Sequence, residues 1–173
     1  GNENLEAVEF FKHLNSIFKK KEPGAVLIAE ESAAWPGVTT PVEEDGLGFD
    51  FKWNTGWTDD LLGYMSLDPI FRGYHHGELT FSMIYAYSED YMLTFSHDDI
   101  VNGKESMIRK MPGRTAQQEA NLRAAYAYMV AHPGKKLLFM GQEFAQEEDW
   151  KAEKELEWDL LEKEDHLEMQ QFV

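Results

Sequence analysis

Four short apolar runs alternate with segments of helical periodicity along this chain, and this alternation limits the folds open to it. The runs are Ala25 to Ala29, Leu47 to Trp53, Tyr91 to Phe95 and Leu137 to Met140. Apolar residues at helical spacing precede three of these runs, most regularly between Thr115 and Val130. The resulting α-β-α-β order predicts an α/β fold with a mostly parallel sheet and helices packed against it.

The sequence also indicates where the helices begin. Asn4 can cap the first helix, and Thr58, followed by two acidic residues, is predicted to open the second. A third helix is expected around residues 79–87. Thr115 with Gln118 three residues later resembles a capping box for the fourth. The run from Leu47 to Trp53 has no predicted helix before it, because the preceding stretch through Pro36-Gly37 and Pro41 is rich in turn residues.

Two architectures fit this order. Four such units could form a small doubly wound sheet, or they could form half of an eight-stranded (β/α)8 barrel. A whole barrel usually has about 250 residues, and the chain has 173. The pattern of elements leaves both possibilities open.

Acidic residues follow two of the apolar runs directly. Glu30 and Glu31 end the first run, and Asp98 and Asp99 follow the third, beside His97. The carboxyl ends of barrel strands carry active sites, and paired carboxylates are what glycosyl chemistry requires. Acids in these positions also arise as helix caps and solvated loop residues. The spacing leaves open which member of each pair is functional, and His97 could equally bind a sugar hydroxyl or a backbone group.

Two tryptophans could bind a sugar ring. Trp35 and Trp53 fall in or beside segments that follow apolar runs, whereas aromatic residues elsewhere are typical of a core. The adjacent pair His75 and His76 lacks the spacing of a zinc site, so no metal is expected. Neither a phosphate-binding glycine loop nor a serine hydrolase elbow is present.

Charge and composition restrict the partners and the location. The formal net charge of −16 disfavours a nucleic acid or an anionic membrane surface as a partner. No apolar stretch approaches the roughly 20 residues that span a bilayer. The chain has no cysteine, which fits a reducing compartment, so a cytoplasmic location is expected.

Four ordered segments resemble the glycogen (1,4-α-glucan) branching enzymes of the α-amylase superfamily. They are Ala29-Glu30-Glu31-Ser32, Gly48 to Trp57, Ser96-His97-Asp98 and Pro133 to Gly141. The resemblance runs nearly from end to end. It points to branching enzymes rather than to amylases in general.

The resemblance implies a fold and a set of roles. The four strands would be the fifth to eighth of a catalytic (β/α)8 barrel, of which residues 1–173 would form the carboxy-terminal half. Glu30 matches the general acid/base of the family, Asp98 the acid that stabilises the transition state, and His97 a contact in the donor subsite. The implied reaction cleaves α-1,4 bonds and forms α-1,6 branches in glycogen, with no cofactor.

The family's nucleophile is an aspartate at the end of the fourth strand, which the resemblance places before Gly1. The chain alone is therefore expected to be inactive, and the missing half of its own barrel is a candidate partner. Three smaller departures from the family pattern leave acceptor preference and transferred chain length open: Asp99, Asn102 and Gln142. Alternative readings are a debranching or trehalose-releasing hydrolase, a non-catalytic glucan-binding half-barrel, and a truncated product.

Overall fold

The computed structural model describes residues 4–101 and 104–173, so Asn102 lies outside the described residues. The four strands form one parallel sheet in the order β1-β2-β3-β4. The helices are α1 (Leu5–Lys21), α2 (Thr55–Ser66), α3 (His76–Phe81), α4 (Thr115–Ala131) and α5 (Glu164–Phe172). The strands are β1 (Ile28–Ala29), β2 (Phe51–Trp53), β3 (Tyr91–Phe95) and β4 (Lys135–Leu138). The predicted parallel α/β fold is confirmed.

The main core lies between β3 and the helices α2 and α4. Leu93 and Phe95 of β3 have no exposed surface, and the Phe95 ring lies 5.5 Å from the Trp57 ring of α2. Leu122 of α4 is also fully buried in this cluster, and Met169 connects it to α5. Burying large apolar side chains contributes about 1.5–3 kcal/mol each. This cluster therefore holds the carboxyl-terminal two thirds of the chain together.

The register divides the strand residues between two faces of the sheet. Parallel partners share a face, and successive residues alternate between faces. Leu93 and Phe95 face the core helices, so the face opposite carries Trp53 paired with Met92, and Phe51 paired with Ile28. These four side chains remain partly exposed. The sheet is therefore well covered on one face and poorly covered on the other.

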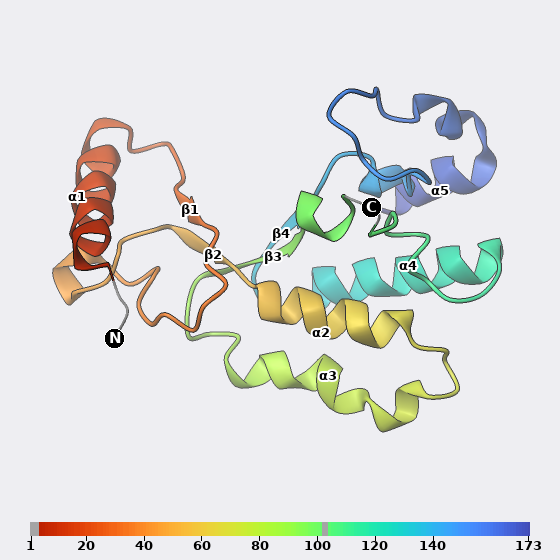
Figure 1. Cartoon of the computed structure of the whole chain (residues 1–173), viewed down its shortest axis with the longest axis horizontal. Coiled ribbons are helices and arrows are strands. Elements are labelled where there is room, and N and C mark those ends of the chain that lie inside the picture. Colours follow the sequence, from red (N-terminus) through yellow and green to blue (C-terminus); the bar gives the residue numbers. More distant parts are fainter. Residues whose placement is uncertain (1–3, 102–103) are drawn as a thin grey trace.

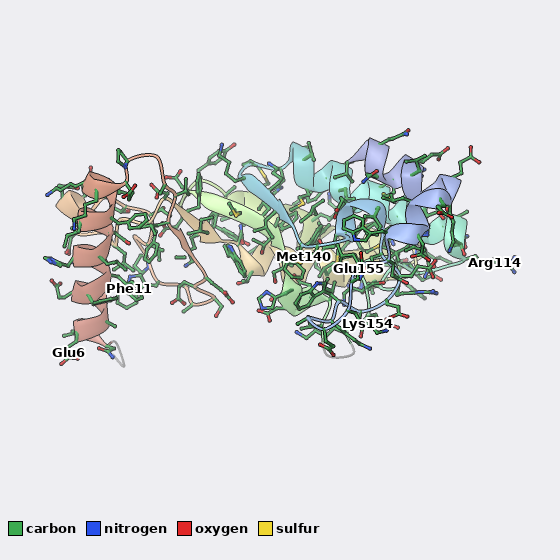
Figure 2. The ribbon with its side chains drawn as sticks, turned by 90° about the horizontal axis from the view of Figure 1, so that it is seen from above. Glu6, Phe11, Arg114, Met140, Lys154 and Glu155 are labelled. Carbon is green, nitrogen blue, oxygen red and sulfur yellow. The ribbon has the colours of Figure 1, made fainter. Side chains whose placement is uncertain are left out.

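The helix α1 stands at one end of the molecule, and α4 and α5 lie at the other end (Figure 1). Phe11 lies on the side of α1 that faces the rest of the chain (Figure 2), where its ring is 5.6 Å from that of Phe49. The buried Asn15 side chain donates to the Leu47 carbonyl at 2.7 Å. Phe10 on the same helix is 60% exposed. Thus the side-chain hydrogen bond and ring contact that tie α1 to the described part of the chain go to the segment that leads into β2.

The first apolar run is less buried than its sequence predicts. Only Ile28 and Ala29 pair as β1, and Val26 and Ile28 are 55% and 39% exposed. A continuous apolar run is typical of a strand covered on both faces. Here β1 is an edge strand, with β2 on one side and no neighbour on the other among the described residues.

Three predicted helix details are wrong. The helix α2 begins at Thr55 because Asn54 caps it through the Trp57 amide, so Thr58 lies inside the helix. The helix expected over residues 79–87 is instead α3 followed by a 3-10 turn, η3 (Ser82–Ile84). At α4 the Gln117 side chain, rather than that of Gln118, accepts from the backbone at the helix start.

The connection from β1 to β2 covers residues 30–50 and contains one 3-10 turn, η1 (Val42–Glu44), but no α-helix. Glu89 holds this connection against the segment before β3. Its carboxylate accepts hydrogen bonds from the Val38 amide at 3.0 Å, the Thr39 amide at 2.8 Å and the Thr39 hydroxyl. Burial acts to raise the pKa of Glu89, but these hydrogen bonds together lower it from its ordinary value of 4.5.

Replacing Glu89 with Gln should therefore destabilise the protein in a pH-dependent way. The ionised carboxylate stabilises the fold above its unfolded-state pKa, and this stabilisation disappears as the pH falls through the lowered folded-state pKa. We expect Glu89→Gln to cost about 1 kcal/mol at pH 7 and clearly less at pH 3. Urea unfolding at both pH values measures the difference. An equal loss at both would contradict this role for the charge.

Candidate active site

The residues after β3 form a 3-10 turn, η4 (His97–Asp99), that fixes two neighbouring acids in different surroundings. The Asp99 carboxylate accepts from the Ser96 amide at 2.7 Å and from the Ser96 hydroxyl at 3.2 Å. The Ser96 hydroxyl in turn accepts from the Asp98 amide at 3.2 Å. Asp99 is thereby engaged in the capping box of the turn, whereas the Asp98 side chain is 59% exposed.

The electrostatics of the two acids differ as well. Burial raises the pKa of Asp99, although the hydrogen bonds from Ser96 and the charge of Lys110 act in the opposite direction. Asp98 faces solvent beside His97, whose Nε2 is 3.4 Å from an Asp98 carboxylate oxygen. The His97 ring also contacts the Phe139 ring at 5.8 Å. Asp98 and His97 are thus available to a ligand together, and Asp99 holds the turn that presents them.

A similar division separates the two acids after β1. The Glu31 carboxylate accepts from the Ala33 amide at 2.6 Å and so shapes the loop that follows. Glu30 is exposed, and its side chain has no hydrogen bond among the described residues. Because β1 and β3 are parallel, Glu30 and Asp98 lie at the same edge of the sheet, with β2 between them. Strands are spaced about 4.8 Å apart, so the two backbones are about 10 Å apart.

Trp35 and Trp53 line a common cavity of about 630 Å³ beside this edge. Trp53 ends β2, and Trp35 lies in the loop after β1; both are half-buried. None of Glu30, His97 and Asp98 lines the cavity. The predicted site residues therefore fall into two groups: three at the strand ends and two in the adjoining cavity.

Two buried polar residues beside the cavity do not figure in the predicted site. The side chain of Lys52 is almost fully buried, and its ammonium donates to the Ala33 carbonyl at 2.9 Å and the Trp35 carbonyl at 3.4 Å. Asn54 caps α2, and its side-chain oxygen also accepts from the Tyr85 hydroxyl at 3.4 Å. The sequence contains a signal for both residues: Lys52 and Asn54 alternate with the apolar Phe51 and Trp53.

At the end of β4, Gln142 begins the 3-10 turn η5 (Gln142–Phe144) and is 3% exposed. Its side-chain oxygen accepts from the Phe139 amide at 3.2 Å, while its Nε2 has no partner among the described residues.

Within residues 4–101 and 104–173, no group of three side chains could hold a metal ion. In the same part of the chain, no helix has the length and apolar character needed to cross a membrane.

The fold and the site define a parallel α/β unit whose sheet presents carboxylates at the carboxyl ends of its strands. Comparison with known proteins is more specific. The 1,4-alpha-glucan branching enzyme GlgB 2 of Rhizobium etli is 57% identical over 173 residues, which is 100% of this chain and 24% of that protein. Branching enzymes of Nitratidesulfovibrio vulgaris and Frankia casuarinae are 58% and 60% identical over 92% and 93% of the chain, which corresponds to 25% and 20% of their own lengths.

Over its whole length this chain is homologous to a segment of the 1,4-alpha-glucan branching enzymes. It spans about a quarter of the length of the curated relatives that it matches. No protein-family model matches the chain.

Proposed function

We propose that this chain is the part of a 1,4-α-glucan branching enzyme that supplies the general acid/base and the transition-state-stabilising acid. The observation that carries the proposal is the 57% identity to a branching enzyme over all 173 residues. The geometry supports it, because Glu30 and Asp98 are the exposed members of their acidic pairs and lie at one edge of the sheet.

The sheet is proposed to form strands five to eight of a (β/α)8 barrel, with residues 1–173 as the carboxy-terminal half of the catalytic domain. The strand order supports this choice. A doubly wound sheet reverses its order at a switch point, whereas neighbours in a barrel follow each other in sequence, as β1-β2-β3-β4 do. The exposed edge of β1 and the poorly covered face of the sheet would then be closed by the other half of the barrel.

The proposed reaction proceeds by two displacements with retained configuration. A carboxylate outside this chain attacks the anomeric carbon of an α-1,4 bond, while Glu30 protonates the departing O4. The oxygen of an acceptor 6-hydroxyl then displaces the enzyme carboxylate. In this step Glu30 removes the proton of that hydroxyl and is protonated again. Asp98 stabilises the oxocarbenium-like transition states, and His97 contacts a hydroxyl of the donor sugar. The carboxylates suffice for these steps, so no organic cofactor is required.

The substrate is proposed to be α-1,4-linked glucan, including glycogen, with Trp35 and Trp53 as stacking surfaces. Both tryptophans line the cavity beside the strand ends and are half-buried, which leaves part of each side chain accessible. The proposed location is the cytoplasm, in line with the cysteine-free sequence. Asp99 and Gln142, which differ from the residues usual in branching enzymes, follow the ends of β3 and β4. At these positions they would affect which acceptor glucan is used.

A chimera tests the proposal. The 173 residues replace the aligned segment of the Rhizobium etli enzyme, and the product formed from amylose is analysed for α-1,6 linkages. We expect the chimera to form branches and the isolated chain to form none, because the nucleophile is supplied by the rest of the enzyme. Free sugars without new branches would favour a hydrolase. Branching by the isolated chain would contradict the proposed division of the site.

A further inference from the structure

A lysine is buried in β2 beneath the loop that follows Glu30. Lys52 is 5% exposed, and its ammonium donates to the Ala33 carbonyl at 2.9 Å and to the Trp35 carbonyl at 3.4 Å. A buried ammonium loses its hydration, and neutral carbonyls compensate for that loss only in part. An apolar side chain of the same length would fill the space without this loss. The charge of Lys52 therefore points to a purpose other than packing.

Lys52 holds the chain on both sides of Glu30. Its backbone pairs in register with Ala29, the residue before Glu30. Its ammonium binds the carbonyl of Ala33, and the Glu31 carboxylate accepts from the amide of the same residue at 2.6 Å. Both ends of the segment 29–33 are thus fixed to one residue of β2, which leaves the segment few conformations.

The same segment buries little apolar surface. Ser32, Ala33 and Ala34 are all exposed. The Glu30 side chain is exposed as well and has no hydrogen bond among the described residues, so the backbone sets where its carboxyl group stands. Segments with few buried apolar contacts open easily unless hydrogen bonds hold them. The two carbonyls bound by Lys52 supply that restraint.

We propose that Lys52 is a positioning residue, which fixes the backbone of Glu30 where the departing oxygen must be protonated. This inference rests on the proposed function of Glu30 as the general acid/base. A proton donor acts only within hydrogen-bond reach of the accepting atom, and a displacement of about 1 Å can lower a rate about 10²-fold. Without the ammonium, two carbonyls of the loop lose their donor, and the segment that carries Glu30 is free to move.

Lys52→Met in the chimera described above tests the proposal. Methionine is unbranched like lysine but has no charge and donates no hydrogen bond. We expect kcat on amylose to fall about 10–100-fold, with KM changed by less than about twofold. The first turnover of α-maltoheptaosyl fluoride should release fluoride at the parent rate, because the enzyme carboxylate displaces fluoride without a proton from Glu30. A loss confined to the donor that needs protonation is not expected from a merely structural role.

Lys136→Met is the matched control. Lys136 of β4 also donates to two backbone carbonyls, those of His132 and Gly134, but these residues precede β4 and so lie at the sheet edge opposite the acids. Its replacement should leave both rates within about twofold of the parent. Glu31→Gln weakens the hold on Ala33 without altering a buried residue. It should lower kcat on amylose at least about threefold and leave fluoride release unchanged.

A Lys52→Met chimera that branches amylose within about twofold of the parent rate would overturn the proposal. An equal loss on amylose and on the fluoride donor would also overturn it, because the acid/base step would then not be the one affected.

Amide hydrogen exchange in the chimera gives a readout that does not depend on catalysis. Exchange at residues 31–35 should accelerate at least about tenfold in Lys52→Met and remain unchanged in Lys136→Met. Unchanged exchange in Lys52→Met would contradict the proposed restraint. Failure of the proposed function is a separate result: the parent chimera would form no α-1,6 branches, although exchange still responded to Lys52→Met.

Discussion

Glu30→Gln should lower the branching rate of the chimeric enzyme by about 10²–10⁴-fold, the range measured for removal of a general acid/base. Glutamine has nearly the same shape, so substrate can still bind, but it cannot donate a proton to the departing O4. Glu30 is exposed and has no hydrogen bond among the described residues, so its replacement disturbs no internal contact. We therefore expect kcat to fall while the unfolding midpoint remains unchanged. The measurement is the rate of α-1,6 linkage formation.

Two further variants sharpen this test. Asp98→Asn should cause a loss of similar size, and the double variant should lose little more than either alone, because residues that act on one transition state are strongly non-additive. Glu43→Gln is the control, since Glu43 is an exposed acid on η1 away from the strand ends. A Glu30→Gln chimera with near-normal turnover would remove the acid/base assignment, and additive losses would argue that the two acids serve separate steps.

Phe95→Ala should destabilise the protein by about 3–5 kcal/mol, as is usual when a large core side chain is truncated. Phe95 has no exposed surface and contacts Trp57 of α2 at 5.5 Å and Tyr126 of α4 at 6.0 Å between ring centroids. Its removal leaves a cavity at the junction of β3, α2 and α4. Domains are stable by only about 5–15 kcal/mol, so the variant should unfold at a much lower urea concentration, as followed by circular dichroism.

Phe71→Ala provides a matched control, because Phe71 is 56% exposed and makes no ring contact among the described residues. Its effect on the free energy of unfolding should stay within about 0.5 kcal/mol. If Phe95→Ala proves too unstable to purify, Phe95→Leu should show a smaller loss in the same direction. Equal effects of Phe71→Ala and Phe95→Ala would contradict the placement of the core between β3 and its two helices.

The outline of the fold was predictable because it depends on local patterns. The apolar run of β3 and the helical stripe of α4 are each long enough to specify their type, and the structure confirms them. The start of α2 was misjudged because Asn54 competes with Thr58 for the cap, and only Asn54 reaches the Trp57 amide. The exposure of β1 does not follow from its apolar run, because such a run contains no information about whether a neighbouring strand is present.

The candidate site was predictable in part. That acids stand at the strand ends follows from the sequence, and their catalytic roles remain predictions. Which acid of each pair is exposed depends on hydrogen bonds that form only once the chain turns, as between Asp99 and Ser96. The buried Lys52 was missed because its two acceptors, the carbonyls of Ala33 and Trp35, approach it only after the connection from β1 has folded back over β2.

The sequence by itself determined the parallel strands, the helices that precede β1, β3 and β4, and the position of acids at strand ends, since these follow from periodicity and from short-range order along the chain. Its homology to branching enzymes is likewise a property of the sequence. The tertiary structure alone decided the cavity, because Trp35 and Tyr85 come from segments far apart in the chain and meet only where the β1 to β2 connection lacks a helix. Contacts of that kind depend on packing between distant segments, which local patterns do not encode.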